Sequence, residues 1–375
     1  MLDLRAIPII EHHGHALARK APDQAVDYLR PFSESDDPVQ LASHVSHTAF
    51  FRWALHRLAD FFHCRPEIEA ILQARATYDP AELSRRFFAE ARIEALLLDY
   101  GYRSDHNLSL EEMRAAVGCR VEPILRLETL AERLIIQHAR LADFREAFAT
   151  TVERARTDGH VALKSIIAYR SGLEIKPPSQ EEVEHGFQRL RARAERGEPI
   201  RLADKPLCDE LVLLALQIAQ RQELPIQFHT GFGDRDLDLR WASPLHLRWI
   251  LESGRYRDVP IVLLHAGYPY VRDTAYLASI YPNVFVDVSL AIPLAGPDIV
   301  SVLTEIFGLA PYSKVMFSSD AHTLPEMYWL AAELGRRELA RALAHLMEAS
   351  WLTRAEAEEV AHRVLHDNAA QLYGL

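Results

Sequence analysis

Six side chains of kinds that bind metal ions or transfer protons lie at or near the ends of apolar segments of the sequence. Imidazole and carboxylate groups together suit zinc or a similar divalent ion, especially where one coordination position stays open for water. Taken singly, each histidine could instead be a hydrogen-bonded core residue, because a chain with 18 histidines contains chance pairs. The six residues are His13, His15, Lys164, His229, His265 and Asp320.

The segment His13-Gly14-His15 carries a geometric argument. Side chains two positions apart on a strand face the same way, so both imidazoles could bind one ion, and Gly14 allows a close approach. His12 has the opposite parity and should point away. Glu11 shares the parity of His13 but lies deeper in the strand, so we expect it to have a supporting or structural role.

Asp320 and Lys164 each leave two interpretations open. Asp320, within FSSDAH, could cap the helix that follows, but an ionised carboxylate near several histidines is better explained by a cation. Lys164, within VALKSII, is costly to bury unless it is paired or modified. It could form a salt bridge, or its amine could add CO2 and become a carbamate that bridges two metal ions.

Eight short apolar segments alternate with helical patterns. Most contain consecutive Ile, Val and Leu, which is typical of strands buried on both faces of a parallel sheet. We therefore predict an α/β fold, a (β/α)8 TIM barrel, in which strand ends carrying the candidate residues share one mouth. The predicted strands are residues 6–15, 93–102, 120–128, 160–169, 224–232, 259–267, 283–290 and 313–322.

The predicted helices lie between these strands and continue to the end of the chain. One interval, about residues 17–90, is too long for a simple loop, so we expect a helical insertion after the first strand, over the mouth of the barrel. Its aromatic block at 50–62 should pack the insertion onto the barrel or, alternatively, line the substrate pocket. Residues 1–375 are read as one domain. The other helices are predicted over 129–158, 181–197, 208–222, 244–253, 271–281, 297–307 and within 327–375.

Composition excludes several classes of protein. The 42 Lys and Arg residues against 53 Asp and Glu give a formal charge of −11, which disfavours nucleic acid as a partner. No run of about 20 apolar residues suggests a membrane span. The three cysteines are far apart, as expected of a chain in a reducing cytoplasm. We expect a cytoplasmic protein that acts on a small molecule, and homo-oligomer formation stays open.

The order of these residues resembles that in the amidohydrolase superfamily of metal-dependent hydrolases. The likeness runs from the HxH of the first strand to the aspartate of the eighth, and NAAQLYGL (368–375) resembles the closing helix of family members. LKSIIAYRSGLEI (163–175) and FSSDAH (317–322) carry a narrower likeness to the amidohydrolase-2 group. Within that group, the chain resembles the domain fused to glutamine-synthetase-like domains in some fungi and plants.

The resemblance implies roles for the six residues. His13, His15 and Asp320 would bind one metal ion, and His229 with His265 would bind a second. Carboxylated Lys164 would bridge the two ions, and its presence places the chain nearer the two-metal hydrolases than most amidohydrolase-2 members. With a single ion, His229 would join the first set and His265 would assist the attacking water. Asp320 would take the proton of that water and pass it to the leaving group.

Substrate selection should depend on the remaining residues at the strand ends. An arginine can pair bidentately with a carboxylate, so we expect a substrate that bears one, although each arginine could instead form a structural salt bridge. Arg103 also follows the second strand. The candidates for binding the substrate are Tyr102, Arg126, Tyr169, Arg170 and His322.

The leading interpretation is a hydrolase of an amide, including a γ-glutamyl-type amide, or of another C–N or ester bond. A second class is a non-oxidative decarboxylase of an unsaturated or aromatic acid, which the amidohydrolase-2 group also contains and which uses one metal. A third is a barrel retained as a catalytically silent metal-binding module.

Overall fold

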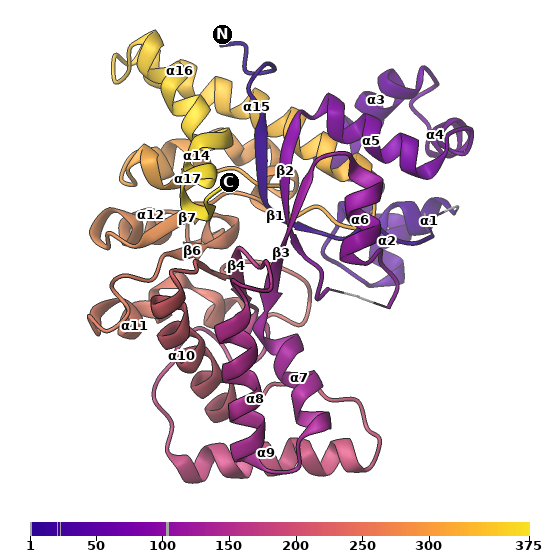
Figure 1. Cartoon of the computed structure of the whole chain (residues 1–375). Helices are drawn as coiled ribbons and strands as arrows, with labels where there is room; N and C mark the ends of the chain where they lie inside the picture. The colour runs from indigo at the N-terminus through magenta and orange to yellow at the C-terminus, as the bar shows by residue number, and fades with distance from the viewer. Residues whose placement is uncertain (1, 21, 23, 103–104) are drawn as a thin grey trace. The chain divides into compact units, whose positions relative to one another are not determined.

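The computed structural model describes residues 2–20, 22, 24–102 and 105–375 (Figure 1). Over these residues, eight parallel strands follow chain order in one sheet, which confirms the predicted (β/α)8 class. Each strand lies inside its predicted range and is shorter than that range. The strands are β1 Ile9–His15, β2 Ile93–Asp99, β3 Arg120–Arg126, β4 Ala162–Ser165, β5 Ile226–Phe228, β6 Ile261–Leu263, β7 Val284–Asp287 and β8 Val315–Met316.

The strands are buried because their side chains are apolar on both faces. Leu163, Ile226, Ile261 and Val284 form one row across β4, β5, β6 and β7, and none of the four is exposed to solvent. Helices must therefore cover such a sheet on its outer face. The next row toward the C-terminal ends begins with Lys164, so a charge follows directly on this apolar layer.

Among the described residues between β1 and β2 there are five α-helices, which agrees with the predicted helical insertion. The aromatic block packs rather than projecting into solvent: the ring centroid of Phe61 lies 4.1 Å from that of Phe87 and 5.2 Å from that of Trp329. The inserted helices are α1 Ala25–Tyr28, α2 Pro38–Ser43, α3 Ala49–Phe62, α4 Ile68–Arg75 and α5 Pro80–Glu90.

Of the remaining helices that the structure describes, most overlap the predicted ranges, whereas those over residues 110–117 and 291–294 were not predicted. The remaining helices are α6 Leu110–Val117, α7 Leu127–Gln137, α8 Leu141–Arg154, α9 Gln180–Glu195, α10 Lys205–Gln222, α11 Arg248–Glu252, α12 Val271–Ile280, α13 Ala291–Leu294, α14 Ile299–Phe307, α15 Pro325–Glu348, α16 Arg354–His362 and α17 Asn368–Tyr373. Short turns of other helix types lie at η1 Arg30–Phe32, η2 Val45–His47, η3 Ile167–Tyr169, η4 Leu239–Ala242, η5 Pro244–Leu247, η6 Leu264–Gly267, η7 Gly296–Asp298, η8 Tyr312–Lys314 and η9 Arg363–Asp367.

The single helix predicted over residues 129–158 is wrong. Two helices, α7 and α8, occupy this range, and the backbone is extended at His138 and Arg140 between them. No glycine or proline marks the break, so the sequence pattern carries no signal of it.

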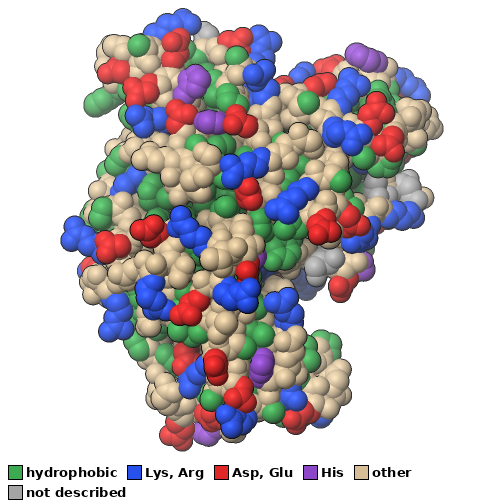
Figure 2. All heavy atoms as spheres, in the orientation of Figure 1, with side chains coloured by type: hydrophobic (Ala, Val, Ile, Leu, Met, Phe, Trp, Pro, Cys, Tyr) green, Lys and Arg blue, Asp and Glu red, His purple; other side chains and the backbone are tan. Residues whose placement is uncertain are grey.

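The chain divides into two compact units. Unit 1 comprises Met1–Glu122, Gly233–Arg235 and Asp287–Gln371, and unit 2 comprises Pro123–Phe232, Asp236–Val286 and Leu372–Leu375. Among the described residues, no helix is long and apolar enough to cross a lipid bilayer. On the face drawn in Figure 2, basic and acidic side chains are interspersed rather than gathered into one basic field.

Candidate functional site

In unit 1, two histidines and one aspartate converge on one point. His13 and His15 end β1, and their Nε2 atoms lie 2.9 Å and 3.0 Å from Oδ1 of Asp320. One ligand atom from each residue lies within 4.8 Å of the others. Both histidines therefore point the same way, as their spacing predicts. We call this set the His–His–Asp cluster.

The tautomer of His15 bears on what this cluster binds. Nδ1 of His15 lies 3.1 Å from the backbone oxygen of Asp99, at the end of β2. Because a carbonyl oxygen only accepts, Nδ1 carries the proton, and the Nε2 of a neutral imidazole presents its lone pair to Asp320. Two lone pairs at this distance repel unless a proton or a cation lies between them. The donor set therefore fits a divalent cation, and a backbone carbonyl that holds the second ring nitrogen is usual for metal-binding histidines.

The backbone places Asp320 beside β1. Its N–H donates to the oxygen of His13 at 3.0 Å, and the N–H of His15 donates to the oxygen of Ala321 at 2.8 Å. The φ of Asp320 is 57°, in the left-handed region that is uncommon for residues other than glycine. Asp320 does not cap α15, because the N-cap position is Leu324. The helix-cap interpretation is therefore wrong.

Gly14 makes room for a tyrosine behind the cluster. A Cβ atom on Gly14 would lie 2.7 Å from Oη of Tyr328 and 2.9 Å from Cδ1 of Leu96. The hydroxyl of Tyr328 donates to the backbone oxygen of His15 at 2.5 Å. The close approach expected at Gly14 is thus that of Tyr328, and it fixes the backbone between the two histidines.

Glu11 joins β1 to the segment that follows β8. It is buried, accepts a hydrogen bond from the N–H of Ser319 at 2.8 Å, and also accepts one from the hydroxyl of Ser318. The N–H of His13 in turn donates to Oγ of Ser318 at 2.8 Å. Burial raises the pKa of Glu11 to about 8, so the carboxyl is mostly protonated at neutral pH. These contacts agree with the supporting role expected of Glu11.

His12 has a partner that sequence reasoning missed. Its Nε2 lies 3.1 Å from Oδ2 of Asp287, at the end of β7, and both side chains are fully buried. His12 is therefore directed away from Asp320, as its parity predicts. The signal for Asp287 was its place directly after the apolar residues of a strand, the same signal that identified His229 and His265.

In unit 2, Lys164 is buried on β4 with 1% of its surface exposed. Its register neighbours are Arg126 on β3 and Gln227 on β5. Registered neighbours lie on the same face of a sheet, about 4.8 Å apart. A second basic residue therefore stands beside the buried lysine.

His229 and His265 hydrogen-bond to each other, with Nε2 of His265 lying 2.9 Å from Nδ1 of His229. We call them the histidine pair. Nε2 of His229 lies 3.1 Å from the oxygen of Phe232, so Nε2 is the protonated nitrogen and Nδ1 accepts from His265. The φ of His265 is 65°, a second left-handed backbone at a candidate residue.

The predicted substrate-binding residues divide between the units. In unit 1, the ring of Tyr102 lies 5.0 Å from that of His15 and 5.6 Å from that of His322. In unit 2, Tyr169 lies 4.4 Å from the ring of His229. Arg126 is the register neighbour of Lys164, and Arg103 lies outside the described residues.

Arg170 pairs with a carboxylate of its own unit. Its Nη2 lies 3.3 Å from Oε1 of Glu132, in α7, and both side chains are largely buried. The structural salt bridge, which was the alternative for each arginine, is thus formed at Arg170. Its binding of substrate stays a prediction.

A small cavity of about 20 Å³ lies beside Asp320 and His322. Its other walls include Pro31 and Glu34 from the insertion and Pro293 from α13. A cavity of this size holds about one water molecule. The insertion therefore reaches the His–His–Asp cluster within unit 1.

Sequence comparison finds a matching family and a curated relative. The family described as Amidohydrolase matches residues 133–375. Protein fluG of Emericella nidulans is 34% identical over 242 residues, which are 62% of this chain but 28% of that protein. This chain thus spans less than a third of that relative, and a link to glutamine-synthetase-like domains stays a prediction.

Solved structures show the same fold along nearly the whole chain. A Lactobacillus casei ATCC 334 protein assigned as a metal-dependent hydrolase has a TM-score of 0.89 and 31% identity, covering 99% of this chain and 96% of that one. An uronate isomerase of Bacillus halodurans C-125 has a TM-score of 0.67 and 14% identity, covering 99% and 94%, which shows the fold alone. On the family match and the likeness to the Lactobacillus protein, this chain belongs to the amidohydrolase family.

Proposed function

We propose that this chain is a metal-dependent hydrolase that cleaves an amide bond, including a γ-glutamyl-type amide, or another C–N or ester bond of a small substrate. The observation that carries the proposal is that Nε2 of His13 and Nε2 of His15 converge on Oδ1 of Asp320. The family match and the Lactobacillus protein support the same class.

His13, His15 and Asp320 would hold one divalent ion. Zinc is our first choice, because two imidazoles and a carboxylate leave a coordination position open. When bound, such an ion lowers the pKa of a water molecule toward about 7, so that a nucleophile forms at neutral pH.

Asp320 also has the chemistry of a proton carrier. Its Oδ1 faces both imidazoles, so we assign proton transfer to the other oxygen, Oδ2. This oxygen would accept the proton of the attacking water and return it to the departing nitrogen, which is a poor leaving group unless protonated. His265 is the second candidate for this transfer.

Lys164, His229 and His265 would serve the same reaction, an assignment supported by their order along the chain. A cationic Lys164 in register with Arg126 is unfavourable, whereas addition of CO2 to the neutral amine gives a carbamate anion and releases one proton. That carbamate would bridge two ions. With one ion, His229 would join the first set and His265 would assist the water.

The substrate would be small and carry a carboxylate. Arg126 and Arg170 stay our candidates for binding that group, and Tyr102, Tyr169 and His322 stay candidates for other contacts with the substrate. Oligomer formation and a cytoplasmic location also stay predictions.

The experiment is a substrate panel of γ-glutamyl amides, N-acyl amino acids and small esters, offered to the protein before and after zinc or manganese is restored. We expect cleavage of at least one member into equimolar acid and amine or alcohol, and its loss with a chelator. Release of CO2 from an aromatic acid panel would favour the decarboxylase. Inertness on both panels with metal bound would favour the silent module.

A further inference from the structure

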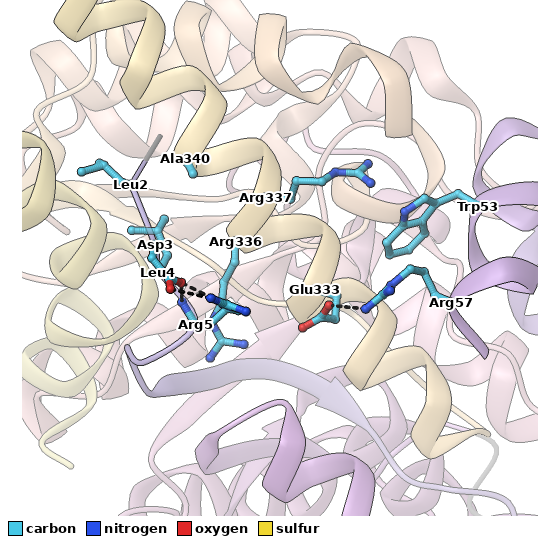
Figure 3. A pocket seen from close by; sticks show the side chains of 10 residues that line it. All are labelled: Leu2, Asp3, Leu4, Arg5, Trp53, Arg57, Glu333, Arg336, Arg337 and Ala340. Atoms are coloured by element: carbon cyan, nitrogen blue, oxygen red, sulfur yellow. Dashed lines mark hydrogen bonds and ion pairs between the residues drawn. The ribbon is translucent and has the colours of Figure 1, made fainter. Parts of the chain in front are cut away.

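Unit 1 contains a second concave site, at the other end of β1 from the His–His–Asp cluster. A cavity of about 350 Å³ is bounded by residues 2–5, which precede β1, and by side chains of α3 and α15 (Figure 3). His13 and His15 are among the last three residues of β1, whereas residues 2–5 precede its first residue. The cavity and the cluster are therefore separate sites. We call it the arginine cavity, after Arg5, Arg57, Arg336 and Arg337 in its wall.

Arg336 is the buried member of this wall. It is 4% exposed, and its Nη2 donates to the backbone oxygens of Ile7 and Ala91 at 2.7 Å and 2.8 Å. Among the residues that the structure describes, its buried Nε has no hydrogen-bond partner. Burial lowers the pKa of Arg336 to about 10, but the guanidinium is still a cation at neutral pH. A buried cation with only neutral partners is costly until an anion joins it.

The nearby carboxylates are already engaged by other arginines. Oε2 of Glu333 lies 3.0 Å from Nη2 of Arg57, and Asp3 pairs through both oxygens with Arg5. Nε of Arg337 donates to Oε1 of Glu338 at 2.6 Å, and Nη1 of Arg57 also donates to Oδ2 of Asp60 at 3.2 Å, so each of these three arginines has a carboxylate partner. Among the described residues, Arg336 is therefore the arginine of this wall whose hydrogen bonds go to no carboxylate.

Trp53 adds a flat apolar surface. The guanidinium of Arg337 lies 5.0 Å over its ring, and Figure 3 shows Arg337 pointing toward Trp53 from α15. A volume of about 350 Å³ is some ten times the ~30 Å³ share of one water molecule in the liquid. The cavity thus has room for an organic group as well as for a bare ion.

We propose that the arginine cavity binds a small organic oxyanion, with its carboxylate or phosphate group on Arg336 and its body against Trp53. Both groups accept charge-assisted hydrogen bonds from a guanidinium. Since Nη2 of Arg336 already donates to two backbone oxygens, its other N–H groups are the donors offered to the ligand. Arg337 and Arg57 also contribute to the wall, each paired with a carboxylate. This site is independent of the proposed hydrolysis and assigns the enzyme a second, non-substrate ligand.

The test uses the metal-loaded full chain and two probes, inorganic phosphate and succinate, against chloride at equal ionic strength. We expect calorimetric binding and a rise in Tm with at least one of the two oxyanions and not with chloride. A preference for phosphate or for succinate would assign the chemical group. Failure of both to bind the wild-type chain would overturn the proposal.

Variants locate the binding. Arg336→Gln should weaken it about tenfold or more, because a charge-assisted hydrogen bond is lost. Since Arg336 also ties two backbone oxygens, the exposed Arg337→Gln is the variant that leaves folding intact, and it should weaken binding as well. Arg354→Gln, an exposed arginine of α16 that is not part of the cavity wall, is the control. Unchanged binding in Arg337→Gln, or in a folded Arg336→Gln, would overturn the proposal.

Discussion

The two units use their histidines differently. In unit 1, His13 and His15 both face Oδ1 of Asp320, whereas in unit 2 His229 and His265 face each other. Histidines that converge on a carboxylate leave a position that a cation fills. Histidines that bond to each other must give up that bond before either nitrogen can bind a metal ion. The side chains of unit 1 thus fit a metal ion as they lie, whereas the two bonded nitrogens of unit 2 would have to separate first.

The units also share two features. Each has a left-handed backbone at a candidate residue, with φ of 57° at Asp320 and 65° at His265. Each also buries a glutamate that accepts a serine hydrogen bond, Glu11 in unit 1 and Glu128 in unit 2. Unusual backbone at chemically capable residues supports a functional role for both. The difference between the units therefore lies in side-chain contacts rather than in strain.

The largest effect should come from Asp320→Asn. The amide keeps the size and one ligand oxygen but cannot carry the proton, so we expect kcat to fall by about 10²–10⁴ while bound metal is retained. Steady-state kinetics on a cleaved substrate and metal analysis of the same sample separate the two roles. The exposed His362→Ala is the control. Near-normal turnover with normal metal content would transfer the proton role to His265.

Metal content should distinguish the units next. Wild-type protein should hold one to two divalent ions per chain. The double variant His13→Ala, His15→Ala should hold no ion at the His–His–Asp cluster. His229→Ala should lose less metal than the double variant, because Nδ1 of His229 is already hydrogen-bonded to His265. Elemental analysis after gel filtration measures both. Full occupancy in the double variant would remove the His–His–Asp cluster from the metal site.

Sequence reasoning predicted what depends on periodicity. The two-residue repeat of a strand places His13 and His15 on one face and His12 on the other, and apolar runs located all eight strands. It could not predict contacts made by backbone atoms, such as the oxygen of Asp99 that fixes His15. The mutual bond of the histidine pair depends on where β5 and β6 place their ends, which no local pattern encodes.

Lys164→Ala tests whether unit 2 contributes an anion. If a carbamate forms at Lys164, the variant should lose most of its activity, and short carboxylic acids with excess metal should restore part of it. Formate and acetate are the probes, with chloride at equal ionic strength as control. Full activity without added acid, or an unmodified lysine in the intact mass and at high resolution, would favour the salt bridge instead.

The smallest effect concerns stability and pH in unit 2. Glu128 is 3% exposed and accepts from the hydroxyl of Ser165 at 2.7 Å, and burial raises its pKa above the usual 4.5. The folded chain therefore keeps a proton that the unfolded chain releases. The contribution of Glu128 to the free energy of unfolding is full below pH 4.5 and declines as the pH rises toward the pKa of the folded state.

Glu128→Gln tests this, because the amide keeps the hydrogen-bond acceptor for Ser165 and cannot ionise. Urea unfolding should find the variant close to wild type at pH 4 and more stable than wild type at pH 7. The exposed Glu146→Gln should leave the pH dependence unchanged, and parallel curves for wild type and Glu128→Gln would show that burial does not hold the proton on Glu128.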